Sequence, residues 1–368
     1  MAECIEHPEN APEYEGLKVN KGIPQPEAMN PHIAERLKHI RRRELGVEDY
    51  VEGILRGDMN ILSQAITLVE SAKAEHQTMA QEVIRRCLPS SGRSVRIGIT
   101  GVPGAGKSTF IESFGKHLTG EGHRIAVLAI DPSSERSKGS ILGDKTRMEE
   151  LSCDPRAYIR PSPSAGSLGG GARKTREAMI LCETAGFDII LVETVGVGQS
   201  ETAVHSMVDF FLLVQIAGAG DELQGIKRGI MEMADSIIIN KADGNNIQRA
   251  ELAKAQLQTA LHYFPPHESG VMPKVMTCSA YERRGIGEVW EHVLHYCSET
   301  QQNGYFEARR AEQSKYWMYE TINEQLRERF YRSQRERLKE AEAQVMRNEV
   351  SSFAAAFDLL DRYFEDQN

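Results

Sequence analysis

One eight-residue stretch constrains the fold of this chain more than any other feature. Residues 101–108 read Gly-Val-Pro-Gly-Ala-Gly-Lys-Ser, which fits the phosphate-loop pattern GxxxxGK[ST] at every fixed position. The apolar run VRIGIT at 95–100 precedes the loop, and a helical pattern follows it from about 107 to 118. A loop of this kind joins a buried strand to a helix in parallel α/β sheets. The sequence therefore predicts an α/β fold built around residues 101–108.

The apolar runs that follow the loop extend this expectation to most of the chain. Short continuous apolar segments alternate with helical patterns, as they do where helices bury both faces of parallel strands. We expect five further strands, at 124–130, 187–193, 210–218, 236–240 and 273–280. The pattern predicts a mostly parallel sheet, covered by helices on both faces, in a domain that spans 94–300.

Segments of different character flank this domain. Residues 1–30 combine Pro, Glu and Asn without apolar periodicity and are expected to form a disordered or loosely docked tail. Residues 31–93 predict an N-terminal helical region, and residues 301–368 a C-terminal helical extension. The extension carries two apolar rows: Trp317, Ile322, Leu326 and Phe330, then Phe353, Phe357, Leu360 and Phe364. Neither helix can bury its own row, so each is expected to dock on the α/β domain or on a second subunit.

The composition excludes several classes of protein. The 53 Asp and Glu residues exceed the 44 Lys and Arg residues, whereas a general nucleic-acid binder normally has a basic excess. No apolar stretch approaches the roughly 18 residues of a membrane-spanning helix, and the N-terminus lacks the apolar core of a signal peptide. The six cysteines form no CxxC pair, which is typical of free thiols in a cytoplasmic protein.

The residue types of the loop suit the binding of a nucleotide phosphate. Its glycines let backbone N–H groups converge on phosphate oxygens without a Cβ atom in the way, and the helix N-terminus adds partial positive charge. Lys107 is expected to reach the β- and γ-phosphates, and the Ser108 hydroxyl to bind Mg²⁺. A purely structural glycine-rich turn is the alternative. The predicted contacts are Gly101, Val102, Pro103, Gly104, Ala105, Gly106, Lys107, Ser108 and Thr109.

Two short motifs after later strands indicate which base is bound. An NKxD pattern at 240–243 directly follows the expected strand, and a Ser-Ala pair follows the strand near 274–278. The Asp243 carboxylate can accept from the N1–H and 2-amino groups of guanine, whereas adenine would leave it unpaired. The motifs favour GTP over ATP; polar capping at strand ends is the alternative. The predicted base contacts are Asn240, Lys241, Asp243, Ser279, Ala280 and Tyr281.

Acidic residues near the ends of other strands are the expected partners of Mg²⁺. Asp131 follows the strand at 124–130, Asp144 lies in the next loop, and Glu193 follows the strand at 187–192. Carboxylates often hold Mg²⁺ through its waters, so with Ser108 we predict Asp131, Asp144 and Glu193 as the metal site. An Asp-Pro turn at Asp131 and a solvated charge at Asp144 are the alternatives. Gly196 is expected to offer its N–H to the γ-phosphate.

Three long motifs carry a resemblance to a known family. They are DPSSERSKGSILGDKTRM at 131–148, ETVGVGQSE at 193–201 and GAGDELQGIKRGI at 218–230. Together with the phosphate loop and the NKAD segment, they resemble the methylmalonyl-CoA mutase-associated GTPases, the MeaB/ArgK family. The resemblance covers about 55 to 300, continues more loosely into the C-terminal helices and leaves out the first 30 or so residues.

The resemblance implies a GTPase that acts as a chaperone of an adenosylcobalamin-dependent acyl-CoA mutase. Such proteins gate cofactor loading and protect or reactivate the mutase, and the mutase stimulates their slow GTP hydrolysis. They are homodimers, and the C-terminal extension contributes to the dimer. Lys227 resembles a lysine that is brought toward the nucleotide when the partner binds, as an arginine finger would be. With Lys107 and Glu193 it makes up the predicted catalytic set, whereas the residues alone indicate only a glycine-flanked surface loop.

Other interpretations remain open from the residues. A metal-insertion GTPase would share the phosphate loop, but the chain has no histidine-rich tail or Cys/His motif beside the nucleotide. A phosphotransferase would need an acceptor site that the sequence does not reveal. His292, His295 and Cys297 form an HxxHxC pattern, for which a packed amphipathic helix is the better interpretation than a metal site. No cobalamin-binding DxHxxG motif is present, so the cobalamin is expected on the partner.

Overall fold

The computed structural model describes residues 45–71, 73–131, 148–163, 168–194, 200–218 and 228–366. Residues 46–368 form one compact unit, and residues 1–45 form another that lies, except for Leu45, outside the described residues. The predicted tail at 1–30 therefore stays a prediction. None of the described helices is long and apolar enough to cross a membrane.

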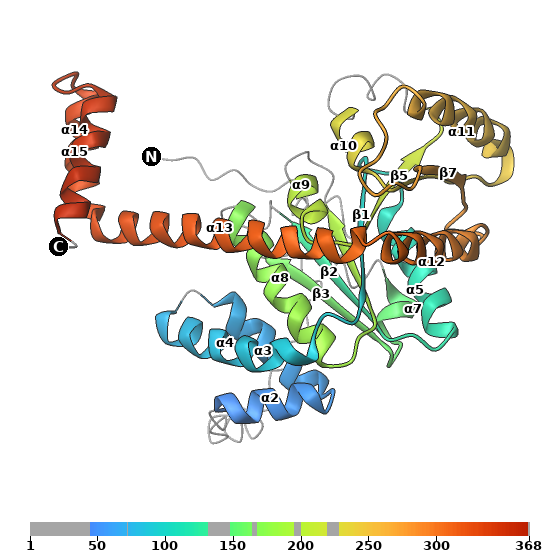
Figure 1. The fold of residues 1–368 in the computed structure, drawn as a ribbon, viewed down its shortest axis with the longest axis horizontal. Helices are drawn as coiled ribbons and strands as arrows, with labels where there is room; N and C mark the ends of the chain where they lie inside the picture. The colour runs from blue at the N-terminus through green and yellow to red at the C-terminus, as the bar shows by residue number, and fades with distance from the viewer. Residues whose placement is uncertain are drawn as a thin grey trace, which may run out of the picture. The chain divides into compact units, whose positions relative to one another are not determined.

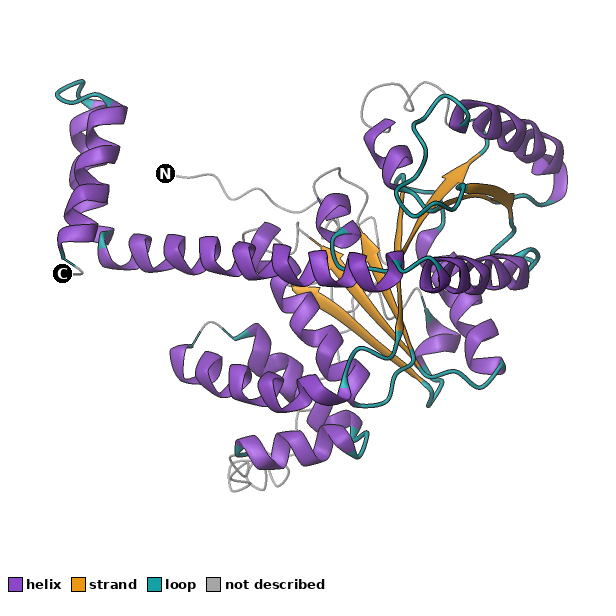
Figure 2. Ribbon diagram, in the orientation of Figure 1, coloured by secondary structure: helices purple, strands orange, loops and turns teal. Residues whose placement is uncertain are grey.

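A seven-stranded sheet lies at the centre of residues 46–368, with the strand order β3-β2-β4-β1-β5-β6-β7 (Figures 1 and 2). All neighbouring pairs are parallel. The strands are β1 Val95–Gly101, β2 Ile125–Asp131, β3 Ala157–Pro163, β4 Ile189–Thr194, β5 Phe210–Ile216, β6 Ser236–Asn240 and β7 Lys274–Thr277. The predicted parallel α/β sheet is confirmed, and all six predicted strands are present with slightly different ends.

The sequence patterns did not predict β3, whose residues read AYIRPSP. Pro161 and Pro163 lack the N–H groups that a central strand needs on both sides. β3 pairs only with β2 and lies at the edge of the sheet, where one side of the strand needs no partner. Proline is tolerated at such an edge, so the prolines hid a strand that its long-range pairing stabilises.

Helices cover both faces of the sheet, because alternate strand residues point to opposite sides. On one face α5 (Lys107–Gly120), α7 (Glu149–Ser152) and α12 (Ile286–Gln302) bury Phe110, Phe114 and Trp290 against Ile97 and Ile99. On the other, α8 (Leu168–Thr184) and α9 (Ser200–His205) pack on the sheet, and Gly98 leaves room for Val204 and Phe211. A third apolar cluster joins β6 and β7 to α10 (Arg228–Met233) and α11 (Ile247–Leu261).

The N-terminal helices α2 (Val47–Leu55), α3 (Met59–Glu70) and α4 (Ala74–Cys87) belong to the same compact unit as the sheet. Leu62, Ile66 and Val83 lie in the apolar cluster that includes the α8 side chains Met179 and Leu181. The described residues also include two 3₁₀ turns, η2 Leu88–Ser90 and η4 Gly244–Asn246. The predicted helical character is confirmed over 47–87, while the domain boundaries at 30, 93 and 300 stay predictions.

The C-terminal extension consists of α13 (Tyr305–Ser333), α14 (Arg335–Met346) and α15 (Ser352–Glu365) (Figure 1). The first predicted apolar row is divided: Trp317 is buried against the domain, whereas Ile322 and Leu326 are about half exposed. The second row faces solvent in the single chain, while the opposite side of α15 carries the buried residues. The exposed side chains of that row are Phe353, Phe357, Leu360 and Phe364.

The first half of α13 is fixed to the amino edge of the sheet by polar contacts. Arg310 donates from Nε and Nη2 to the two carboxylate oxygens of Asp209, at 2.7 and 2.6 Å, just before β5. Its Nη1 and Nη2 also donate to the carbonyl oxygens of Gly92 and Ser94, both at 2.6 Å. This buried ion pair ties the extension to the segments that lead into β1 and β5.

Candidate nucleotide-binding site

The phosphate loop lies at the carboxyl end of the central strand, between β1 and α5. Gly101 has φ 153°, and a Cβ atom there would lie 2.1 Å from the carbonyl oxygen of Val214 on β5. Gly106 has φ 83°, and its Cβ would lie 2.8 Å from Nδ2 of Asn240. Both positions need glycine because neighbouring backbone and the base-site asparagine pack directly against the loop.

Lys107 begins α5 and is buried beneath the loop. Its Nζ donates to the carbonyl oxygen of Gly101 at 2.8 Å and to that of Val102 at 3.4 Å. Burial lowers the pKa of Lys107, and the carboxylates of Glu193 and Glu201 act in the opposite direction. The ammonium is thus held at the phosphate loop within a negative field.

Two oxygen ligands expected for Mg²⁺ meet beside the loop. The Ser108 hydroxyl donates to Oε1 of Glu193 at 3.2 Å. Strand pairing explains this contact, because β4 lies next to β1 and Glu193 pairs in register with Ile99. A hydroxyl and a buried carboxylate are hard oxygen donors, so these two residues fit Mg²⁺.

The other predicted ligands are less directly placed. Asp131 is the last residue of β2, which β4 separates from β1, so its backbone lies two strands away from the phosphate-loop strand. The Asp131 side chain, Asp144, Gly196 and Lys227 lie outside the described residues. Their predicted contacts with metal, phosphate or substrate stay predictions.

One buried acid beside the loop was not predicted. Glu201, in the first turn of α9, is 1% exposed and accepts from the Ser200 hydroxyl at 3.2 Å. Its charge contributes to the field at Lys107. Glu201 is the last residue of the ETVGVGQSE motif, which was the sequence signal for a role at the site. Its place in the first turn of a helix was no signal, because an acid there is common and usually solvated.

The base-site motifs come together around Asn240, the last residue of β6. Asn240 Nδ2 donates to the carbonyl oxygen of Ala105 at 2.9 Å, and its Oδ1 accepts from the N–H of Ala280 at 3.0 Å. The Ser279 hydroxyl donates to Oδ2 of Asp243 at 2.6 Å. Asn240 therefore links the phosphate loop to the 279–281 segment, and Ser279 orients the carboxylate expected to meet guanine.

The outer residues of the base site are open to solvent. Lys241 adopts φ 59° and is exposed, and the Tyr281 side chain is 88% exposed. An exposed lysine stem and aromatic ring at the rim can cover the faces of a planar base. The inner residues Asn240 and Ser279 are buried, so the site has a rigid floor and an open rim.

The HxxHxC pattern lies on a helix that packs against the sheet. His292 and Cys297 are buried in α12, and the His292 ring lies edge-on against Phe210 with centroids 5.9 Å apart. His295 is exposed on the same helix. Its side chain therefore does not share the buried position of the other two, and the predicted packed helix is confirmed.

Comparison with known proteins assigns the family and the fold. A family described as "Methylmalonyl Co-A mutase-associated GTPase MeaB" matches residues 62–335, which include the phosphate loop, the Ser108–Glu193 pair and the base site. The chain belongs to this family of GTPases. The resemblance noted from the motifs is confirmed, and the chain is a P-loop GTPase.

Individual relatives agree with the family match. GTPase ArgK of Escherichia coli is 46% identical over 283 residues, covering 77% of this chain and 86% of the relative. The mitochondrial methylmalonic aciduria type A homolog of Mus musculus is 46% identical over 334 residues, covering 88% and 80%. A crystal structure described as LAO/AO transport system kinase has a TM-score of 0.68 and 36% identity, covering 86% of this chain and 97% of that one.

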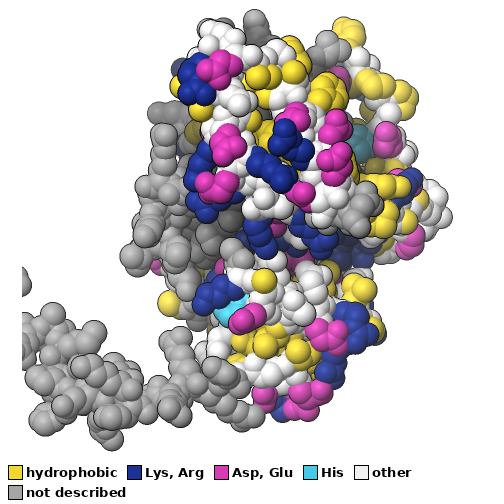
Figure 3. Space-filling model, turned by 90° about the vertical axis from the view of Figure 1, so that its left-hand side faces the viewer, with side chains coloured by type: hydrophobic (Ala, Val, Ile, Leu, Met, Phe, Trp, Pro, Cys, Tyr) yellow, Lys and Arg dark blue, Asp and Glu magenta, His cyan; other side chains and the backbone are white. Residues whose placement is uncertain are grey.

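The family assignment gives the ligand class of the site. Members of P-loop GTPase families bind GTP and GDP, normally with Mg²⁺, and the family description associates these proteins with methylmalonyl-CoA mutase. On the face shown in Figure 3, Lys and Arg side chains are interspersed with Asp and Glu side chains.

Proposed function

We propose that this GTPase is a chaperone of an adenosylcobalamin-dependent acyl-CoA mutase, for which it gates cofactor loading and protects or reactivates the enzyme. The family match over 62–335, described by association with methylmalonyl-CoA mutase, carries the proposal. Hydrogen bonds connect the phosphate loop to β4 and β6. These connections support a site whose bound nucleotide affects the elements that a partner contacts. The cobalamin belongs to the mutase, and the GTPase contributes timing through hydrolysis.

Catalysis in this proposal is electrostatic positioning rather than covalent chemistry. Lys107 binds the β- and γ-phosphates, and Ser108 with Glu193 holds Mg²⁺, joined by Asp131 and Asp144. When bound, the metal neutralises charge on the phosphate oxygens. Gly196 donates its N–H to the γ-phosphate, and the buried Glu193 and Glu201 keep negative charge around the lysine.

The Asp243 carboxylate is the predicted source of guanine specificity. We expect Asp243→Asn to weaken GDP binding by at least about 100-fold, because a site built around a polar contact rejects a ligand that leaves it unpaired. Xanthine carries an oxygen in place of the 2-amino group, and an amide N–H can donate to that oxygen. The variant should therefore gain affinity for xanthosine diphosphate.

Fluorescent-nucleotide titrations of GDP and xanthosine diphosphate measure both effects. Ser279→Ala is the matched control, since it leaves the carboxylate but removes the hydroxyl that donates to it at 2.6 Å. It should weaken GDP binding by less than Asp243→Asn and leave the base preference unchanged. Unaltered GDP affinity in Asp243→Asn would refute the base-site assignment.

Lys227 is the proposed partner-dependent catalytic residue. Lys227→Ala should leave basal hydrolysis unchanged and remove most of the stimulation by the mutase, because a charge that arrives only in the complex stabilises the transition state only there. GTPase rates with and without the mutase measure this effect. Equal stimulation of the variant and the wild-type protein would contradict the assignment.

Co-purification with a candidate mutase, followed by GTPase assays of the two proteins together, tests the whole proposal. We expect a nucleotide-dependent complex and faster phosphate release than from the GTPase alone. No complex in any nucleotide state and no stimulation would count against the chaperone role. Transfer of labelled γ-phosphate to protein instead of water would favour the phosphotransferase alternative.

The oligomeric state and location form part of the same proposal. The exposed row of α15, with Phe353 78% and Phe357 67% exposed, is more apolar surface than a single helix normally leaves in water. We propose that a second copy of the chain covers it in a homodimer. A cytoplasmic location is consistent with the free thiols at Cys87, Cys153, Cys182, Cys278 and Cys297.

A further inference from the structure

The segment 240–243, which carries the predicted base contact Asp243, leaves the end of β6 in an uncommon backbone conformation. Lys241 has φ 59°, a left-handed conformation that costs free energy for a residue with a side chain. Such a backbone persists only where its surroundings hold it in place. The hydrogen bonds of its carbonyl groups therefore show what fixes the position of the Asp243 carboxylate.

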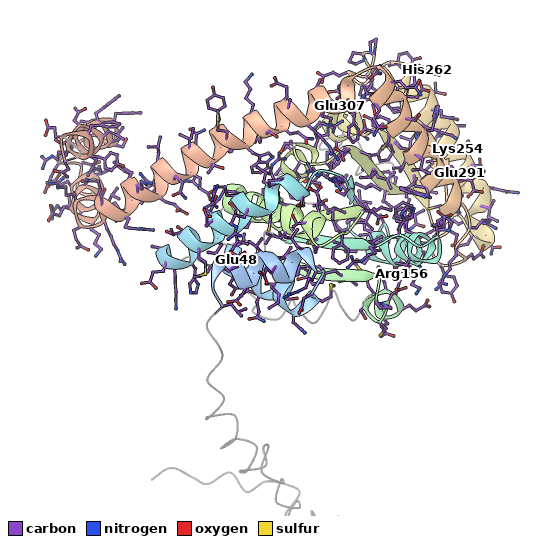
Figure 4. The ribbon with its side chains drawn as sticks, turned by 60° about the horizontal axis from the view of Figure 1, so that its bottom comes forward. Glu48, Arg156, Lys254, His262, Glu291 and Glu307 are labelled. Carbon is purple, nitrogen blue, oxygen red and sulfur yellow. The ribbon has the colours of Figure 1, made fainter. Side chains whose placement is uncertain are left out.

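Two of these carbonyl groups are bonded by the turn that follows the segment. Asn246 donates from Nδ2 to the carbonyl oxygen of Lys241 at 2.7 Å, and its backbone N–H donates to the carbonyl oxygen of Asp243 at 2.9 Å. Asn246 belongs to η4, which leads into α11, the helix on which Lys254 is labelled in Figure 4. The carbonyl group between these two, that of Ala242, has a different donor.

The Ala242 carbonyl is bonded by an arginine from a later part of the chain. Nη2 of Arg284 donates to the Ala242 oxygen, and the Ala242 N–H donates to the carbonyl oxygen of Cys278 at 3.0 Å. A peptide group is planar, so the Ala242 oxygen lies in the same plane as the Asp243 nitrogen. A donor that fixes this oxygen therefore also fixes the direction in which the chain enters Asp243.

A closed loop sets the position of Arg284. Ser279 and Arg284 form an antiparallel bridge, in which each N–H donates to the carbonyl oxygen of the other residue, at 2.9 and 3.0 Å. Gly285 follows with φ 77°, where a Cβ atom would lie 2.7 Å from the carbonyl oxygen of Thr277. The loop 279–284 thus presents the Arg284 side chain from a defined backbone position.

Arg284 is one of two adjacent arginines in this loop. Its hydrogen bond to the carbonyl is charge-assisted, but its side chain is 53% exposed and also pairs with Glu282 at 3.3 Å. Solvent weakens such a bond, so we expect a moderate contribution. Arg283 is also 53% exposed but pairs with Glu150 of α7 at 2.6 Å. The two arginines therefore differ in what they contact and not in residue type or exposure.

We infer that Arg284 is a positioning residue for guanine recognition, which holds the Ala242 peptide so that the Asp243 carboxylate meets the N1–H and 2-amino groups of the base together. Arg284 acts through Asp243 and needs no contact with the nucleotide. The inference rests on the proposed base site at Asp243 and is independent of the partner that the GTPase serves. It adds a determinant of specificity outside the NKxD and Ser-Ala motifs.

The first test compares two nucleotides that differ by one group. Inosine diphosphate lacks the 2-amino group of GDP, so the ratio of the two dissociation constants measures how well the carboxylate engages that group. In Arg284→Met we expect GDP binding to weaken by about three- to fivefold, which is the loss of one hydrogen bond, and inosine diphosphate binding to change little. The ratio should fall accordingly. At saturating GTP, kcat should stay at the wild-type value while KM rises.

Matched variants separate this effect from a loss of charge. Arg283→Met removes the same charge from the same loop, and Lys254→Ala removes one outside it; both should keep the wild-type ratio. Arg284→Lys keeps a charged donor without the guanidinium fork and should retain part of the ratio. Inorganic pyrophosphate, which has no base, should bind all variants equally, and thermal melting checks their folding. An unchanged ratio in Arg284→Met, or an equal fall in Arg283→Met, would overturn the inference.

A second test shows whether Arg284 acts through Asp243. Asp243→Asn already removes the carboxylate, so adding Arg284→Met to it should weaken GDP binding by less than about twofold more. A loss as large as the one that Arg284→Met causes in the wild-type background would show that Arg284 acts independently of Asp243, contrary to the inference.

The results also separate the two hypotheses. If Asp243→Asn leaves GDP affinity unaltered, the base-site assignment fails and the role of Arg284 fails with it. If Asp243→Asn weakens GDP binding but Arg284→Met keeps the wild-type ratio, the base site stands and only the role of Arg284 is refuted.

Discussion

Lys107→Ala should abolish measurable GTP turnover and weaken nucleotide binding. The Lys107 ammonium is buried under the phosphate loop and donates to the carbonyl oxygens of Gly101 and Val102 at 2.8 and 3.4 Å. Lys107 is the first residue of the helix that follows β1. Alanine at this position removes the charge that offsets developing negative charge on the phosphates. Removing one such preorganised group typically costs about 100- to 1,000-fold in turnover.

Phosphate release and fluorescent-GDP titration together measure the effect. Lys107→Arg keeps the charge but not the compact ammonium, and it should retain more nucleotide affinity than alanine does. Lys254→Ala is the control, because this lysine lies on α11 and forms an ion pair with Glu251, three residues earlier on the same helix, at 3.6 Å. This variant should hydrolyse GTP at the wild-type rate. Wild-type turnover in Lys107→Ala would defeat the phosphate-loop assignment.

Arg310→Met should be the most destabilising single substitution in the C-terminal extension. The Asp209 side chain is 1% exposed and accepts hydrogen bonds from Nε and Nη2 of the Arg310 guanidinium. Methionine preserves part of the packing on the Phe306 ring, which lies 4.4 Å from the guanidinium carbon, but leaves the carboxylate without its counter-charge. Breaking a buried pair in this way costs about 3–5 kcal/mol of unfolding free energy.

Urea unfolding followed by circular dichroism measures this loss. Arg327→Met on the exposed part of α13 is the matched control and should change stability by no more than about 0.5 kcal/mol. The double variant Arg310→Met with Asp209→Asn should lose less than the sum of the two single losses, since it removes both charges of one pair. An unfolding midpoint of Arg310→Met equal to that of the wild-type protein would show that the pair does not hold the extension to the sheet.

Local patterns in the sequence were sufficient for most of the elements and for the ligand class of the site. Six apolar runs predicted six of the seven strands, because parallel strands buried on both faces must be apolar over several consecutive residues. Glycines at 101 and 106 marked the loop, and the structure gives the reason: a Cβ atom would collide with Val214 or Asn240. The NKxD pattern predicted the base contacts without any knowledge of strand order.

Contacts between distant segments could not be read from such patterns. β3 was missed because its prolines argue against a strand, and only its pairing with β2 at the edge of the sheet accommodates them. The Ser108–Glu193 contact depends on β4 lying beside β1, an order that no local periodicity contains. Glu201 looked like an ordinary helix-start acid until its burial was known.

The C-terminal extension shows most clearly which features local patterns predict and which depend on contacts between distant segments. Helical periodicity determined which residues of α13 share an apolar row, but docking decided that Trp317 is buried and that Ile322 and Leu326 are exposed. Arg310 and Asp209 are 101 residues apart in a charged chain, where each alone resembles a solvated surface residue. Short-range periodicity and motif spacing act within one element and are therefore encoded locally. Burial and charge pairing depend on which elements meet, and only the tertiary structure decides that.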